Sequence, residues 1–105
     1  MNINGYISGS IYSGITNRSN ETIELISFGV YDGNTGVRVG YTTDPSKLGI
    51  LSPGATTNLG MQFNSVYLPI FKWTFKWNNQ EYAVQHQYTG SRSATKSGIK
   101  LNTIN

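Results

Sequence analysis

Apolar and polar side chains alternate most clearly in the segment FKWTFKWNNQEYAVQHQY at residues 71–88. A two-residue turn at Asn78 and Asn79 is favoured here, because asparagine tolerates the positive φ angles that such hairpin turns require. One face of the resulting hairpin is aromatic and the other is polar, which predicts that the aromatic face lies on a core. The predicted facing pairs are Phe75–Tyr82, Trp73–Val84 and Phe71–His86 on the aromatic side and Lys76–Glu81, Thr74–Ala83 and Lys72–Gln85 on the polar side.

Similar alternation recurs along the rest of the chain, interrupted by clusters of Gly, Pro, Asn, Asp and Ser that are typical of turns. This pattern predicts an all-β fold, a single-domain antiparallel β-sandwich of about seven strands with an immunoglobulin-like architecture over residues 1–105. No apolar run approaches the roughly 18 residues of a membrane span. The predicted strands cover residues 5–15, 22–31, 36–42, 56–63, 69–77, 80–88 and 98–104.

A second hairpin is predicted around a turn at Arg18 and Ser19, with Gly9 leaving room beneath the Phe28 ring on its inward face. Its outward face is a polar strip with a tyrosine pair at one end, a composition typical of adaptable recognition surfaces. The strip is the first candidate contact surface, although an ordinary outer face or one covered by a second copy in a homo-oligomer fits equally well. The strip consists of Tyr6, Tyr31, Ser8, Ser10 and Ser27.

The turn of the aromatic hairpin is the second candidate contact surface. Trp77, Asn78 and Asn79 combine an indole with two amides, and Trp77 is the aromatic residue of this hairpin expected to be partly exposed. An exposed indole beside amides can stack on a sugar or enter a lipid interface.

Charge and composition exclude several classes of function. The net charge of +3 at pH 7 comes from Arg92, Lys96 and Lys100, because the charges of residues 1–89 cancel. Three cations without interleaved aromatic residues are a weak phosphate footprint, so no nucleic-acid partner is expected. Cysteine is absent and the single histidine, His86, is predicted to be hydrogen-bonded at the edge of the core, so we expect no enzyme, no metal site and no cofactor.

The segment FGVYD at residues 28–32 resembles the strand end of the FxLYD family of bacterial β-sandwich modules. It follows the glycine-bearing strand of Gly9 and the turn NRSN, and it precedes a turn glycine and the motif LSPG, as in that family. Val30 replaces the family's leucine, the Trp-rich hairpin is not part of the pattern, and the likeness covers roughly residues 5–60. The resemblance implies an immunoglobulin-like sandwich and favours an extracellular or cell-envelope location over the cytoplasm.

We therefore expect a non-catalytic interaction module that binds a protein or glycan through its surface. The alternative is a small membrane-active, toxin-like β-sandwich that docks on lipid headgroups through exposed Trp and Tyr. Small lipid-binding sandwiches of the aegerolysin and actinoporin kind are similar in size, but no motif of theirs matches this sequence, and fold alone does not imply function.

Overall fold

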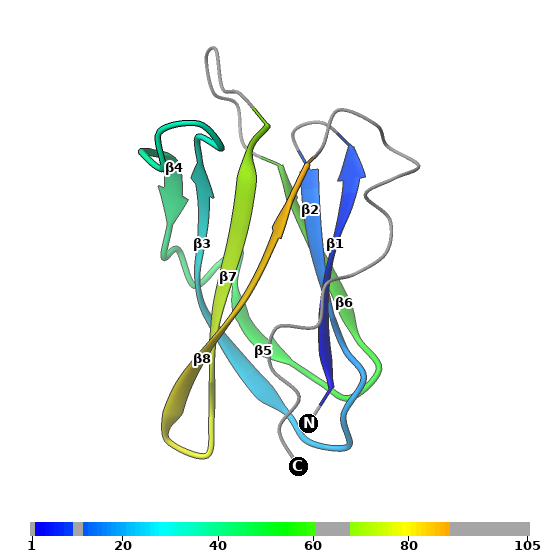
Figure 1. The fold of residues 1–105 in the computed structure, drawn as a ribbon. Helices are drawn as coiled ribbons and strands as arrows, with labels where there is room; N and C mark the ends of the chain where they lie inside the picture. Colours follow the sequence, from blue (N-terminus) through cyan, green and yellow to red (C-terminus); the bar gives the residue numbers. More distant parts are fainter. Residues whose placement is uncertain (1, 10–11, 61–67, 89–105) are drawn as a thin grey trace.

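The computed structural model describes residues 2–9, 12–60 and 68–88, which form eight β-strands and no helix (Figure 1). Within these residues no helix could cross a membrane. The strands are β1 (Ile3–Gly9), β2 (Tyr12–Asn17), β3 (Ile23–Tyr31), β4 (Arg38–Thr42), β5 (Gly49–Leu51), β6 (Thr56–Gly60), β7 (Ile70–Trp77) and β8 (Gln80–Gln87).

The strands form two antiparallel sheets that pack face to face, which confirms the predicted β-sandwich (Figure 1). One sheet has the order β1-β2-β6. The other has the order β4-β3-β7-β8, and β5 pairs with β3 beyond the end of β4. The edge strands β1 and β8 also approach each other, so the two sheets meet along this side.

The aromatic hairpin has the predicted turn and register. Asn78 and Asn79 adopt φ angles of 53° and 64°, and all six predicted facing pairs are present between β7 and β8. Trp73 and Phe75 are fully buried, which confirms that this stretch is core.

Aromatic rings from β3 and β7 form the centre of the core. The Phe28 ring lies 4.4 Å from the ring of Trp73 and 6.1 Å from that of Phe71, measured between centroids. Each of these side chains is fully buried. Burial of a large apolar side chain stabilises the fold by about 1.5 to 3 kcal/mol, so these rings are a major part of what holds the sheets together.

The predicted N-terminal hairpin is wrong. The expected strand over residues 5–15 is two strands, β1 and β2, which pair with each other, and β3 lies in the opposite sheet. Tyr6 therefore faces Gly14 in place of Tyr31, and Tyr31 faces Ile70. The polar strip inferred from the predicted pairing does not form, and Gly9 pairs with Tyr12 while Phe28 pairs with Thr42 and Trp73.

The remaining strand predictions differ in smaller ways. β5 falls in a segment expected to be turn, and it brings the strands of the described residues to eight. The strand predicted at residues 98–104 and the cations Arg92, Lys96 and Lys100 lie outside the described residues.

Asn17, at the end of β2, directs the chain from one sheet to the other. Its side-chain amide is fully buried and donates to the carbonyl oxygens of Glu21 and Leu51 at 2.7 and 3.0 Å. Its side-chain oxygen accepts from the backbone N–H of Ser19, and its backbone carbonyl accepts from Gly54. The turns NRSN and LSPG, far apart in sequence, are therefore joined by one asparagine.

Replacing Asn17 with alanine is expected to lower the free energy of unfolding by about 3 kcal/mol, because the Leu51 carbonyl in the core and the Ser19 amide lose the partner that Asn17 supplies and the Glu21 carbonyl loses one of two donors. Chemical denaturation measures the loss. Asn20→Ala, at an exposed position of the same turn, is the control and should change stability by less than about 0.5 kcal/mol. Equal effects of the two substitutions would show that Asn17 does not have this role.

Candidate functional site

The outward side of the five-stranded sheet, called here the outer face, carries the candidate site. Successive side chains of a strand point to opposite sides, so the residues between the core positions of β3, β7 and β8 face outward. One row in register across the sheet consists of Tyr41, Gly29, Lys72 and Gln85. A neighbouring row of short side chains consists of Ser27, Thr74 and Ala83.

Two tyrosine rings on the outer face are held in place by their neighbours. The ring of Tyr31 lies over Gly29, where an added Cβ atom would come within 3.0 Å of its Cε1 atom. The ring of Tyr41 is covered by the guanidinium of Arg38, whose Cζ atom is 4.1 Å from the ring centroid, a cation–π contact. Each ring is therefore held in one orientation, so a contact with a ligand would cost little side-chain entropy.

The lysine hollow is an open depression of about 250 Å³ on this face. Lys72 lies on the central strand β7 and faces Gly29 on one side and Gln85 on the other, so no carboxylate faces it in the register. The ammonium group is thus the charge available to a ligand here. The hollow is lined by Tyr31, Gly36, Ile70, Lys72 and Gln85.

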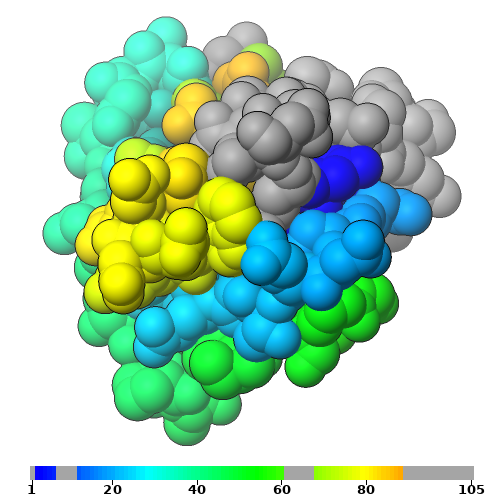
Figure 2. Space-filling view, turned by 90° about the horizontal axis from the view of Figure 1, so that it is seen from below, coloured from blue at the N-terminus to red at the C-terminus, as the bar shows by residue number. Residues whose placement is uncertain are grey.

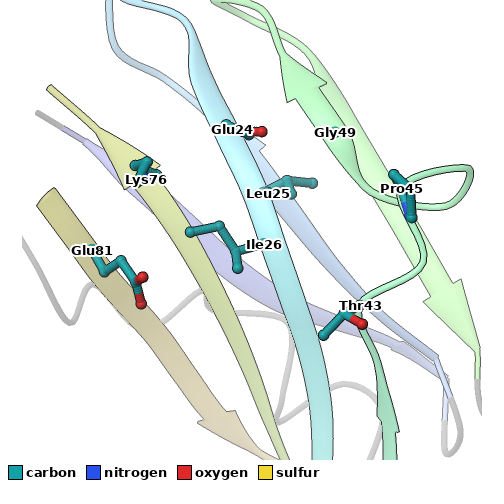
Figure 3. Close-up of a pocket in the computed structure, with 8 residues that line it drawn as sticks. All are labelled: Glu24, Leu25, Ile26, Thr43, Pro45, Gly49, Lys76 and Glu81. Carbon is teal, nitrogen blue, oxygen red and sulfur yellow. The ribbon is translucent and has the colours of Figure 1, made fainter. Parts of the chain in front are cut away.

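The bulge hollow, of about 370 Å³, lies near Lys76, at the end of β7 opposite to Ile70 and the lysine hollow. Figure 3 shows its lining residues. It forms because Ile26 is the extra residue of a bulge against β7, and because neither β4 nor β5 pairs with it on the other side. Its lining residues are Glu24, Leu25, Ile26, Thr43, Pro45, Gly49, Lys76 and Glu81.

The two hollows differ in charge. At the bulge hollow, Lys76 faces Glu24 on β3 and Glu81 on β8, so one cation stands between two carboxylates (Figure 3). At the lysine hollow Lys72 faces only glycine and an amide. The outer face is therefore cationic at one end and acidic at the other.

The structure separates the residues of the predicted polar strip. Tyr31 and Ser27 lie on the outer face, whereas Tyr6 lies on the other sheet, where its ring covers Gly14 and its hydroxyl donates to Asn58 Oδ1 at 3.0 Å. The Ser8 side chain and all of Ser10 lie outside the described part of the chain. A contact role for each of these residues stays a prediction.

The predicted tip of the aromatic hairpin is present, and Trp77 is half-buried as expected. Its ring lies 6.2 Å from the ring of Tyr82, between centroids, while Asn78 and Asn79 are exposed. In the view from below, the yellow tip lies beside the blue connection between β2 and β3 (Figure 2). The indole therefore packs on the protein's own core, and the two amides form the exposed part of the tip.

Four residues of the outer face were not singled out as site residues from sequence. Lys72 and Gln85 were predicted as an outward pair of the hairpin, which was the available signal. Tyr41 and Arg38 lie in a strand for which the sequence predicts neither the neighbouring strand nor the outward face, so their position beside Tyr31 could not be predicted.

A serine and a histidine meet inside the sandwich. Ser13 Oγ on β2 lies 2.7 Å from His86 Nε2 on β8 and accepts a hydrogen bond from the Trp73 indole at 2.9 Å. The Tyr6 carbonyl lies 3.3 Å from the same hydroxyl. If Ser13 donates to this carbonyl and His86 Nε2–H donates to Ser13, every hydrogen of the cluster has an acceptor. The cluster thus joins the two sheets by polar contacts.

The serine and histidine resemble a nucleophile and its base in spacing, but they are enclosed. Ser13 is 0% exposed and His86 4% exposed, so the pair lies in the core and opens to neither hollow. His86 Nδ1 lies against the backbone of Gly5, where an added Cβ would come within 2.5 Å of it, and it has no hydrogen-bond partner. Ser13 was not singled out from sequence, although it is a polar residue at an inward position of the alternation.

Burial lowers the pKa of His86 to about 4, because a charged imidazole would lose its hydration inside the core. A contact with the Tyr6 backbone acts in the opposite direction. Among the described residues, no group of three His, Asp or Glu side chains could hold a metal ion. The turn after β3 is built as expected of an ordinary turn, with Asp32 Oδ1 accepting from the amides of Asn34 and Thr35 and Gly36 at a φ of 75°.

No protein-family model and no curated protein matches this sequence. The geometry of the outer face is therefore the basis on which a function can be assigned.

His86 makes folding stability depend on pH. In the unfolded chain it gains a proton near its ordinary pKa of 6.5, but the folded protein resists protonation until about pH 4. The contribution of the neutral His86 to the free energy of unfolding is therefore fully present above pH 7. About 2 kcal/mol of it is lost as the pH falls from 7 to 5. Urea denaturation at each pH measures this slope. In His86→Gln, which does not titrate, the slope should vanish over this range, and a slope that persists would assign the effect to another group.

Proposed function

We propose that the protein is a non-catalytic recognition module that binds a glycan through the outer face of its five-stranded sheet. The observation that carries this proposal is the pair of pre-oriented tyrosine rings, Tyr31 over Gly29 and Tyr41 under Arg38, next to an open hollow. Tyrosine offers a rigid apolar ring and a polar hydroxyl, which suits the apolar C–H faces and the hydroxyl groups of a sugar.

A glycan fits the outer face better than a protein partner does. The hollows, of about 250 and 370 Å³, lie just below and just above the roughly 300 Å³ at which pockets for drug-sized ligands begin, so they suit small units such as sugar rings. Protein interfaces are held mainly by buried apolar anchors at their centre. Here the rows across the centre of the sheet consist of glycine, serine, threonine, alanine, lysine and glutamine, and the exposed Tyr41 and Ile50 lie on the edge strands β4 and β5.

The resemblance to FxLYD modules favours an immunoglobulin-like architecture more than it favours a function. Two of the motifs that carry it, NRSN and LSPG, meet at Asn17 and maintain the crossing between the sheets. They lie away from the outer face, so in this proposal they are part of the scaffold and not of the binding site.

Tyr41→Ala is expected to weaken glycan binding at least about tenfold, since loss of one stacking ring costs about 1.4 kcal/mol or more. A glycan array identifies the bound sugars, and titration calorimetry then compares the variants. Tyr12→Ala is the matched control, because Tyr12 and Tyr41 are 49% and 46% exposed but lie on opposite sheets. We expect its affinity to stay within about twofold of the unmodified protein.

Three results would overturn the proposal. The first is loss of binding in Tyr12→Ala with retention in Tyr41→Ala, which would move the site to the three-stranded sheet. The second is an array without any bound glycan. The third is sedimentation with liposomes accompanied by a blue shift of tryptophan emission, which would favour the membrane-active alternative.

A further inference from the structure

The lysine hollow contains a charge of the outer face that no carboxylate offsets in the strand register. Arg38, which pairs with Tyr31, is a second such charge, and its guanidinium lies over the Tyr41 ring. Lys72 is half-buried on the central strand β7, and its cross-strand neighbours are Gly29 and Gln85. Lys76, on the same face of the same strand, has Glu24 and Glu81 as its neighbours. The two lysines thus lie on the same face of the same strand and differ in their cross-strand neighbours.

We infer that the glycan is acidic and that its carboxylate binds to Lys72 in the lysine hollow. This inference rests on the proposed function. Lys72 is half-buried at the hollow, and an anion from the ligand gives its ammonium group a charge contact that the protein itself does not supply in this register. A sugar carboxylate, as in a hexuronic acid, brings that anion together with a ring for Tyr31.

The other residues that line the lysine hollow include both apolar and polar side chains, and a sugar acid has both an apolar face and polar groups. The Tyr31 ring and the Ile70 side chain are apolar surfaces for the C–H face of the sugar ring. The Gln85 amide lies beside Lys72 in the register and can donate to a carboxylate or accept from a hydroxyl. The lysine hollow therefore offers both an apolar wall and a polar, cationic wall, and its volume of about 250 Å³ suits a single ring.

The charges at the bulge hollow determine which way round a glycan chain would bind. Glu24 and Glu81 outnumber Lys76 there, so a second carboxylate would be repelled. A glycan that spans both hollows would place its acidic residue at Lys72 and neutral residues toward Lys76. An acid branch or cap on a neutral chain meets this condition better than a polyuronate does.

The test compares acids with their methyl esters, which have the same shape without the charge. The probes are glucuronic-acid-substituted xylotriose and tri-galacturonate, each as free acid and as carboxyl methyl ester, together with neutral cello- and manno-oligosaccharides. We expect the substituted xylotriose to bind at least about tenfold more tightly as the acid than as the ester, and more tightly than tri-galacturonate. Higher salt should weaken binding of the acid and leave the ester unaffected.

Lys72→Gln removes the charge, and Lys76→Gln is the matched control. Lys72→Gln should abolish the preference for acid over ester, and Lys76→Gln should retain the preference. The inference is overturned if the ester or a neutral sugar binds as well as the acid, or if both lysine variants lose the preference equally. In those cases glycan binding through Tyr41 still stands. Absence of binding to every probe and to the array refutes the proposed function itself.

Discussion

The hydrogen bond from the Trp73 indole to the Ser13 hydroxyl fixes how the two sheets lie on each other. Apolar packing between the sheets is strong but non-directional, so by itself it allows the sheets to slide. A buried donor and acceptor must meet at one geometry, because leaving either without a partner in the core costs more than the bond contributes. His86, on the adjacent strand, completes the contact from the side where β1 and β8 approach.

The orientation set in the core also determines the outer face. Once Phe71, Trp73 and Phe75 point inward, alternation places Lys72 and Thr74 on the opposite side of β7. The rigid aromatic layer beneath them keeps the strands and the hollows of the candidate site in place. The same rows of residues that stabilise the sandwich thus present the tyrosines and the lysine to solvent.

The β7–β8 hairpin could be predicted residue by residue because its register depends on a two-residue turn and on alternation, both local properties. The N-terminal half could not, because a strand that turns back within its sheet and one that crosses to the opposite sheet have the same local pattern. The crossing depends on Asn17 reaching Leu51, a contact distant in sequence. Tyr41 and Arg38 escaped notice for the same reason, since their place beside Gly29 depends on how β4 pairs.

Three tyrosines on the outward faces lie over glycines: Tyr6 over Gly14, Tyr12 over Gly60 and Tyr31 over Gly29. Each ring shields a stretch of backbone that has no side chain of its own. A methyl group at Gly14 or Gly60 would collide with the ring above it, and one at Gly29 would be in tight contact with Tyr31, so a change at each of these glycines requires a change in its tyrosine. The tyrosine and the glycine of each pair are therefore expected to covary among related sequences. A related sequence that keeps only one member of a pair is expected to have a different surface at that position.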